Sequence, residues 1–299
     1  MHKETKEVGA YLKVLKNLEN LGEKYCKENL NSFDIKKLST NWWEALKFFF
    51  NHTFMRGRND ELSGKYLNHT LSVLEDLFEI TSKDLEKSYS ILMLNSKFYD
   101  KTQVIDFKGQ MNVRNCLDIN IRDKFNDSIA RGNKTVSLLV SVANSIKDPK
   151  QQIPLGNDLD LVMVLDVLDF ISNENRKNIY KYLKDTIQED GLSSAYRQLV
   201  NLSGIGDKLA SFTLRDICLL NPSLKIDDYE LVFPIDTWAR QVSEKIFKYE
   251  NDTEIKGFFI KQCAKDFNFL KVSAGIWYIG ANSLELLISL YKKQDFKNI

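Results

Sequence analysis

Residues that break helices are scarce in this sequence of 299 residues. It contains only 13 glycines and 4 prolines, while 43% of its residues are apolar and 28% are charged. This composition favours a helix-rich globular protein over a β-sandwich or a disordered chain. A chain of this length can bury a large core, either as one domain or as two closely packed lobes. We therefore expect an all-α fold.

Cysteines are few and widely separated along the chain. The sequence contains four of them, Cys26, Cys116, Cys218 and Cys263. Zinc sites and iron–sulfur clusters require closely spaced cysteines, so we expect no cluster and no metal site. A structural monovalent cation at the Gly204–Gly206 turn is the one bound ion that the sequence leaves open.

The sequence also lacks a long apolar run and an excess of one charge. No segment approaches the length of a membrane span, and the opening residues Met1–Glu4 carry no apolar signal region. We therefore expect an intracellular protein, cytoplasmic or in the nucleoid, with no membrane partner. The formal net charge of +1 excludes a uniformly basic nucleic-acid wrapper, but it allows a local positive face for a small DNA footprint.

Apolar residues recur at three- and four-residue steps through most of the sequence, which predicts amphipathic helices. The prolines in Asp148–Pro154 interrupt this pattern, because each disfavours helix at the residue before it. Two short runs, Val104–Phe107 and Met111–Val113, are predicted as strands. The predicted helices are Tyr11–Leu30, Trp42–Met55, Leu67–Ile80, Leu159–Ile171, Glu174–Ile187, Leu192–Leu202, Lys208–Leu220, Pro234–Phe247, Glu254–Phe269 and Ser273–Lys292.

A glycine-rich turn separates two of the predicted helices. Gly204 and Gly206 flank Ile205, and Lys208 follows just inside the second helix. The glycines permit a tight turn and leave no side chain between the backbone N–H groups and an approaching phosphate. The dipole at the N-terminus of the second helix favours the same anion. The pattern therefore indicates a helix-hairpin-helix that holds a DNA backbone.

Downstream, Pro234 and Asp236 stand at the predicted start of another helix. Together, the Gly-x-Gly-x-Lys turn and this Pro-x-Asp-Thr segment resemble the helix-hairpin-helix superfamily of DNA base-excision glycosylases, which includes endonuclease III and the 8-oxoguanine glycosylases. The resemblance covers roughly 199–246. Two departures are a longer gap before the aspartate, which keeps Asp227 and Asp228 as alternative acids, and Trp238 where many members carry histidine.

The resemblance implies a two-lobed helical fold with the active site between the lobes. On that plan, residues 156–252 form a helical barrel that carries the hairpin and the catalytic residues. Residues 1–87 contribute to the second lobe, and the C-terminal helices in 253–299 pack with them. Residues 88–155 extend the usual core.

The resemblance also implies that Lys208 and Asp236 carry the chemistry. Lys208 would attack C1′ of an extruded nucleotide, displace the damaged base and form an iminium that permits β-elimination. Asp236 would stabilise the positive charge on the sugar and help to deprotonate the lysine or a water. The residues alone leave two simpler roles open. Lys208 could bind a phosphate without reacting, and Asp236 could serve only as a helix N-cap.

Other candidate residues contact the DNA or the extruded base. The expected backbone contacts are Gly204, Ile205, Gly206, Arg56 and Arg58. Asn51 resembles the polar residue that relatives insert into the space left by the flipped base. The motif around Trp277 resembles the C-terminal helix of the 8-oxoguanine glycosylases, so that Trp277 could stack on the base, with Phe212 lining the same pocket. Both aromatic rings could instead belong to the core.

These residues predict a bifunctional DNA glycosylase and AP lyase. Its expected substrate is a damaged base in duplex DNA, most simply an oxidised purine such as 8-oxoguanine, and it is expected to act as a monomer. Two alternatives stay open. One is a glycosylase that removes a modified base in DNA modification or defence, and the other is a non-catalytic DNA-binding protein.

Overall fold

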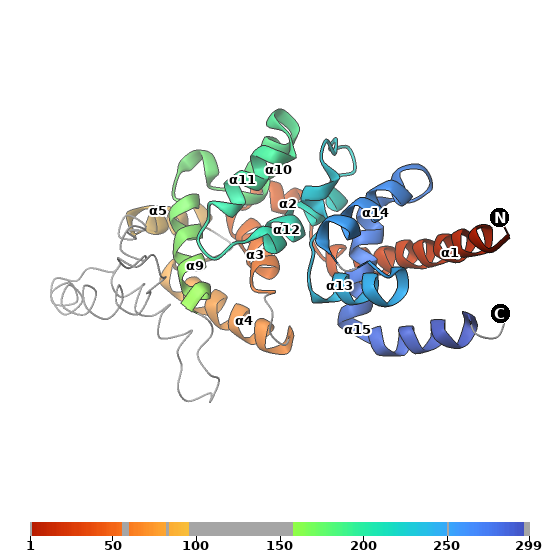
Figure 1. Ribbon diagram of the computed structural model, residues 1–299. Coiled ribbons are helices and arrows are strands. Elements are labelled where there is room, and N and C mark those ends of the chain that lie inside the picture. Colours follow the sequence, from red (N-terminus) through yellow and green to blue (C-terminus); the bar gives the residue numbers. More distant parts are fainter. Residues whose placement is uncertain (1, 56–59, 82–83, 96–157, 250, 296–299) are drawn as a thin grey trace, which may run out of the picture. The chain divides into compact units, whose positions relative to one another are not determined.

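The structure is a computed structural model that describes residues 2–55, 60–81, 84–95, 158–249 and 251–295 (Figure 1). These residues are mostly helical and contain no strand, which confirms the all-α prediction for this part of the chain. The predicted strands Val104–Phe107 and Met111–Val113 lie outside it. Within the described ranges, no helix has both the length and the apolar character that crossing a bilayer requires.

Two compact units make up the chain. Unit 1 combines Met1–Ile35, Thr186–Arg197 and Asp207–Ile299, whereas unit 2 combines Lys36–Asp185 and Gln198–Gly206. Each unit therefore contains segments that are distant in the sequence. Two helices, α10 (Ile179–Asp190) and α11 (Leu192–Val200), have residues in both.

Unit 2 is organised around the aromatic helix α3. The other helices assigned to it are α2, α4, α5 and α9. Their bounds are α2 (Ile35–Thr40), α3 (Trp42–Thr53), α4 (Asp60–Leu77), α5 (Leu85–Asn95) and α9 (Asp158–Ile171). Helices α2 and α5 were not predicted. The six residues of α2 make fewer than two turns, too few to show a helical period.

The polar tips of two buried aromatic residues connect the helices of unit 2. Trp42 Nε1 donates to the carbonyl of Leu85 at 3.0 Å, which joins α3 to α5. The Tyr89 hydroxyl donates to the carbonyl of Ile171 at 2.9 Å, which joins α5 to α9. Burying these rings therefore leaves neither polar group unpaired, as close packing requires.

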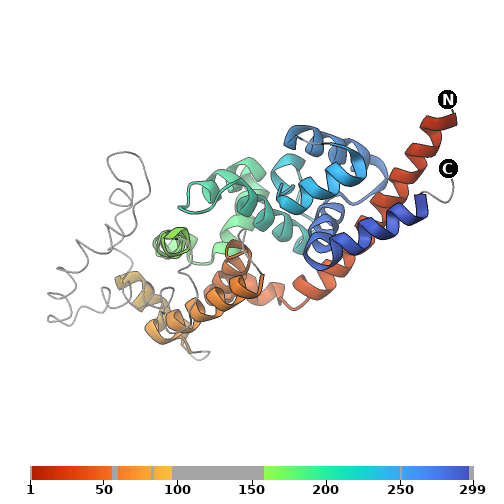
Figure 2. The same cartoon turned by 60° about the horizontal axis from the view of Figure 1, so that its bottom comes forward.

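Unit 1 contains the remaining long helices. They are α1 (His2–Tyr25), α12 (Asp207–Leu220), α13 (Thr237–Val242), α14 (Asp252–Asp266) and α15 (Phe269–Asp295). Helices α1 and α15 pack along each other (Figure 2). A Cβ atom on Gly22 would lie 1.9 Å from the carbonyl oxygen of Lys271, and one on Gly275 would lie 1.9 Å from that of Leu18. These glycines therefore let the two backbones touch.

The predicted helix Pro234–Phe247 begins too early. In the structure, α13 begins at Thr237, and Asp236 is its N-cap, with its side chain accepting the N–H of Ala239 at 2.8 Å. Residues 233–236 precede the helix, and the chain continues after it as a π-helical turn, Ser243–Phe247. A single capping side chain, rather than apolar periodicity, sets this boundary.

Asparagine side chains set other boundaries that periodicity did not predict. The predicted helix Glu174–Ile187 is interrupted, because Asn178 accepts the N–H of Lys181 at 2.8 Å and starts α10 there. Likewise, Asn268 accepts the N–H of Lys271 at 3.1 Å, so that α15 begins at Phe269 rather than Ser273. An apolar pattern in the sequence can therefore continue past a position where a helix begins or ends in the structure.

Candidate functional site

A tight turn joins α11 to α12 at the predicted position. Gly204 has φ +75°, a left-handed conformation that costs glycine little and other residues more. Ile205 is buried, and its N–H donates to the carbonyl of Leu202 at 3.1 Å. The buried isoleucine therefore anchors a turn whose shape depends on its first glycine.

The turn presents backbone N–H groups on its glycines. The buried carboxylate of Asp166, on α9, accepts the N–H of Ser203 and so holds the start of the turn. Within the described residues, the N–H groups of Gly204 and Gly206 donate no hydrogen bond. A Cβ atom on Gly206 would meet no described atom within 4 Å. An incoming acceptor could therefore approach the backbone at Gly206 closely.

Asp236 is a mostly buried carboxylate at the start of α13. Burial raises its pKa, while the N–H of Ala239 and the positive charges of Lys208 and Arg215 act in the opposite direction. The pKa is raised overall from its ordinary value of 3.8. Asp236 is thus a stronger base than an exposed aspartate, and it interacts electrostatically with Lys208 inside unit 1.

The two alternative acids have partners of their own in the preceding loop. Asp227 accepts the N–H of Leu192 at 3.2 Å. Asp228 caps a short 3-10 turn by accepting the N–H of Glu230 at 2.9 Å. Both carboxylates therefore have a structural role that explains their presence, although the same is true of Asp236 and its N-cap.

Trp238, the second residue of α13, packs against α15. A Cβ atom on Gly280 would lie 2.2 Å from Cγ of Trp238, so the indole lies directly on the glycine. The contact brings the first turn of α13, which Asp236 caps, against α15. This close packing was not visible in the sequence.

Lys208, Phe212 and Arg215 share one face of α12. Their spacing of four and then three residues brings side chains together on a helix. Lys208 lies in the first turn and is partly exposed, whereas Phe212 and Arg215 are buried. The face therefore runs from a lysine near solvent to an arginine in the interior of unit 1.

The two aromatic residues predicted for a base pocket are in contact. The rings of Phe212 and Trp277 meet edge-on, with centroids 5.4 Å apart. Trp277 also meets Tyr25 of α1 edge-on at 5.5 Å. Trp277 is only partly buried, so its ring lies between the buried rings and solvent. This geometry suits a pocket wall and a core aromatic equally.

Sequence reasoning missed a buried charged network beside these rings. Arg215 Nε donates to Asp216 Oδ1 at 2.8 Å, and the Tyr25 hydroxyl donates to the other oxygen of Asp216. The Arg215 guanidinium lies 4.2 Å from the centroid of the Phe212 ring and 5.0 Å from that of Tyr25. The adjacent charges at 215 and 216, within an otherwise apolar stretch of α12, were the available indication.

The remaining predicted contacts are not placed with this cluster. Asn51 lies partly buried on α3 in unit 2. Arg56 and Arg58 lie outside the described residues. The structure therefore places Phe212 in contact with Trp277, and it places the charge of Lys208 where it lowers the pKa of Asp236. It supplies no geometry for the predicted wedge or for the two arginines.

Known proteins were compared with the chain. No protein-family model, curated protein or solved structure matches it. The functional assignment therefore depends on the chemistry of the residues themselves. Where side chains are described, no group of three or more His, Cys, Asp or Glu residues could hold a metal ion.

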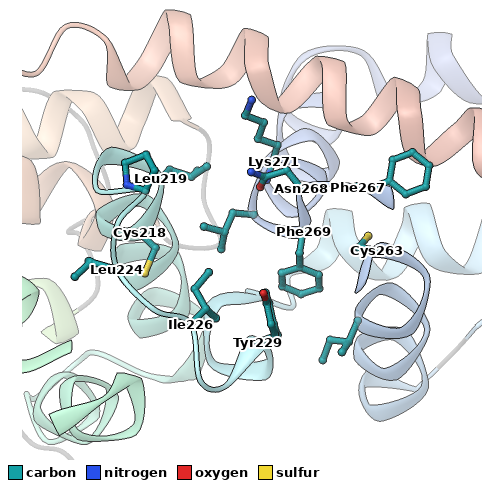
Figure 3. Close-up of a pocket in the computed structure, with 13 residues that line it drawn as sticks. Cys218, Leu219, Leu224, Ile226, Tyr229, Cys263, Phe267, Asn268, Phe269 and Lys271 are labelled. Atoms are coloured by element: carbon teal, nitrogen blue, oxygen red, sulfur yellow. The ribbon is translucent and has the colours of Figure 1, made fainter. Parts of the chain in front are cut away.

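Unit 1 also contains a cavity of about 350 Å³ between the end of α12, α14 and the start of α15 (Figure 3). Its lining is mainly apolar and includes Tyr229 and Phe269, whose rings meet edge-on at 5.0 Å. Cys218 and Cys263 enter from different helices, and burial raises the pKa of each thiol to about 12. Neither Lys208 nor Asp236 lines this cavity, so it is separate from the cluster around α12.

Proposed function

We propose that this protein is a bifunctional DNA glycosylase and AP lyase that removes an oxidised base, such as 8-oxoguanine, from duplex DNA inside the cell, acting as a monomer. The observation that carries the proposal is the placement of Lys208 in the first turn of α12 and of Asp236 as the N-cap of α13 in the same unit, where the charge of Lys208 lowers the pKa of Asp236. A lysine and a mostly buried carboxylate at the starts of two helices are the groups that this chemistry needs. The proposed membership of the helix-hairpin-helix superfamily remains based on sequence resemblance.

The reaction begins with the Lys208 amine. Its Nζ forms a bond to C1′ of the extruded nucleotide as the N-glycosidic bond breaks, and that electron pair leaves with the base, which takes up a proton. Ring opening gives an iminium between Nζ and C1′. Removal of a C2′ proton then expels the 3′ phosphate as the C3′–O bond breaks, which completes the β-elimination.

Asp236 is proposed to assist the first step in two ways. Its carboxylate accepts the proton that the ammonium form of Lys208 must lose, and the raised pKa makes it a better base for this transfer. It then passes this proton to the departing base, and the carboxylate that results stabilises the positive charge that develops on the sugar. Because water has reduced access to this partly buried carboxylate, the stabilisation is stronger than it would be at a fully exposed position.

The glycine turn is proposed to hold the DNA backbone. The N–H groups of Gly204 and Gly206 would donate to one or two phosphates, and the positive end of α12 would add a favourable dipole. Such contacts fix the position of the protein on the DNA backbone, but they do not depend on the base sequence. Recognition of the damaged base must therefore come from elsewhere in the protein.

Borohydride trapping tests the covalent step. Borohydride reduces an iminium to a stable amine, so the wild-type protein should form a covalent adduct with an abasic duplex. Lys208→Gln should abolish the adduct while leaving DNA binding largely intact. Lys225→Gln, which removes an exposed lysine from the same unit, is the matched control and should form the adduct normally.

Each alternative predicts a different result. An undiminished adduct in Lys208→Gln would assign the nucleophile to another residue. Wild-type protein that binds duplex DNA but forms no adduct would be a DNA-binding module rather than a lyase. Base release from a panel of duplexes would separate an oxidised purine from a modified base of another kind.

A further inference from the structure

Arg215 is a fully buried cation with two donor groups for which the described residues supply no hydrogen-bond acceptor. Its side chain has 0% exposure, and its Nε donates to Asp216. Neither Nη1 nor Nη2 has a hydrogen-bond partner among the described residues. Leaving buried donors unpaired costs free energy, and the cost is greater when the group is charged. Within the described part of the chain, Arg215 therefore lacks an acceptor that another molecule could supply.

Arg215 lies on the same helix as Lys208, the residue proposed to carry out the reaction. Arg215 follows Lys208 and Phe212 on the same face of α12, and its charge lowers the pKa of Asp236. Phe212 and Tyr25 flank the guanidinium, and Trp277 stands edge-on against both of these rings. Of these three rings only Trp277 is partly exposed, so a ligand that enters from solvent would meet Trp277 first.

The charge balance indicates a neutral ligand. Asp216 already offsets the charge of Arg215 through a 2.8 Å contact, and Asp236 likewise offsets the charge of Lys208. A phosphate would therefore bring uncompensated negative charge into the interior. A carbonyl oxygen accepts hydrogen bonds from a guanidinium without that cost. A flat ring with carbonyl groups on its edge would also suit the aromatic surroundings.

We propose that Nη1 and Nη2 of Arg215 donate hydrogen bonds to carbonyl oxygens on the edge of the extruded base, so that Arg215 selects carbonyl-bearing bases. The inference rests on the proposed function and names the substrate class of that site. Oxidised guanine offers carbonyl oxygens. Adenine presents an amino donor on its major-groove edge, which would oppose the donors of Arg215.

The test measures recognition without catalysis. The probe is a duplex that carries 2′-fluoro-8-oxo-2′-deoxyguanosine, because the fluorine slows cleavage of the glycosidic bond. Its affinity is divided by that for the same duplex with unmodified adenosine at that position, using fluorescence anisotropy. We expect the wild-type protein to prefer the lesion, and Arg215→Met to lower this preference by about 10- to 100-fold, the effect of losing charged hydrogen bonds.

Further variants distinguish recognition from folding. Arg215→Met leaves Asp216 as an unpaired buried charge, so the double variant Arg215→Met, Asp216→Leu removes the pair together, a change that is often tolerated. It should also lose the preference. Arg176→Met is the matched control, because Arg176 also lies over a phenylalanine ring, Phe170 at 4.6 Å, in unit 2. It should keep the preference.

The outcomes separate this inference from the proposed function. A wild-type protein with no preference for the lesion, or a folded double variant that retains it, overturns the role of Arg215. Borohydride trapping of abasic DNA is scored separately. A preference that depends on Arg215, without any trapped adduct, would support the recognition site and refute the lyase mechanism.

Discussion

Helices α3 and α12 both bury polar groups, but they satisfy them differently. In α3, His52 Nδ1 lies 2.7 Å from the carbonyl oxygen of Phe48, and the Thr53 hydroxyl donates to that of Phe49 at 3.2 Å. These partners are one turn away in the same helix. In α12, the paired charges of Arg215 and Asp216 depend on a tyrosine from another helix, and two donors stay unpaired among the described residues.

This difference separates a stabilising core from a candidate site. A buried polar group that makes its hydrogen bond within its own helix needs no partner from a neighbouring helix, so aromatic rings can pack around it. A buried group with unused donors costs stability and is kept where something else offsets that cost. On this basis, substitutions in α3 should mainly affect folding, whereas substitutions around α12 should mainly affect chemistry and recognition.

The largest expected effect is on the stability of unit 2. Phe50 has 0% exposure and meets Phe54 edge-on at 5.8 Å. Phe50→Ala should lower the free energy of unfolding by about 3–5 kcal/mol, because it removes buried area and leaves a cavity. Urea denaturation measures this loss. Met93→Ala, at an exposed position with 38% exposure, should change stability by less than about 0.5 kcal/mol; similar losses in both would contradict the assigned core.

The acid near α12 should affect catalysis more than folding. Asp236→Asn should slow base release by roughly a hundredfold or more, because it removes the charge that is proposed to stabilise the transition state. Asparagine can still cap α13, so the fold should persist. Single-turnover excision measures the rate. Equal slowing in Asp227→Asn, with Asp236→Asn active, would move the catalytic acid into the preceding loop.

Because the pKa of Asp236 is raised, both base release and stability should depend on pH through this residue. Base release should decline as pH falls through the raised pKa, because the carboxylate becomes neutral. The contribution of Asp236 to the free energy of unfolding should change in the opposite direction and decrease as pH rises. The folded state binds the proton more tightly than the unfolded state, so Asp236 favours folding below its ordinary pKa and loses that contribution as pH rises through the raised value. Asp236→Asn should abolish both dependences.

The smallest expected effect concerns Trp277. If its ring stacks on the extruded base, Trp277→Ala should weaken excision of the damaged base by about 1–3 kcal/mol. Cleavage at a preformed abasic site should change much less, because no base has to be held there. A comparison of the two rates in one variant measures the difference. An equal fall in both rates with a lower melting temperature would make Trp277 a core residue.

Several features of the fold were predictable because they depend on neighbouring residues. The predicted helix Lys208–Leu220 differs from α12 by one residue at its start. Apolar periodicity also predicted α3 and α9, since repeated burial of one face leaves a regular pattern. The boundaries set by Asp236, Asn178 and Asn268 were wrong or missed, because one capping side chain can end a pattern that otherwise continues.

The candidate site was predictable only in part for the same reason. Lys208 and Asp236 stand beside recognisable local patterns, a glycine turn and a proline-containing helix start. Arg215 has no such pattern, and its importance depends on which groups surround it. Its unused donors are visible only once the helices that bury it have been placed, because burial is a property of the packed unit.

The sequence by itself therefore determined the helical class, the glycine turn and the presence of a lysine and an aspartate at neighbouring helix starts. Only the tertiary structure decided that Tyr25 meets Asp216, across 191 positions of sequence, and that Trp238 lies on Gly280. The physical reason is the distance along the sequence over which each kind of interaction acts. Periodicity, capping and turn conformation act over a few residues, whereas close packing and the loss of water around a charge require segments that are distant in the chain.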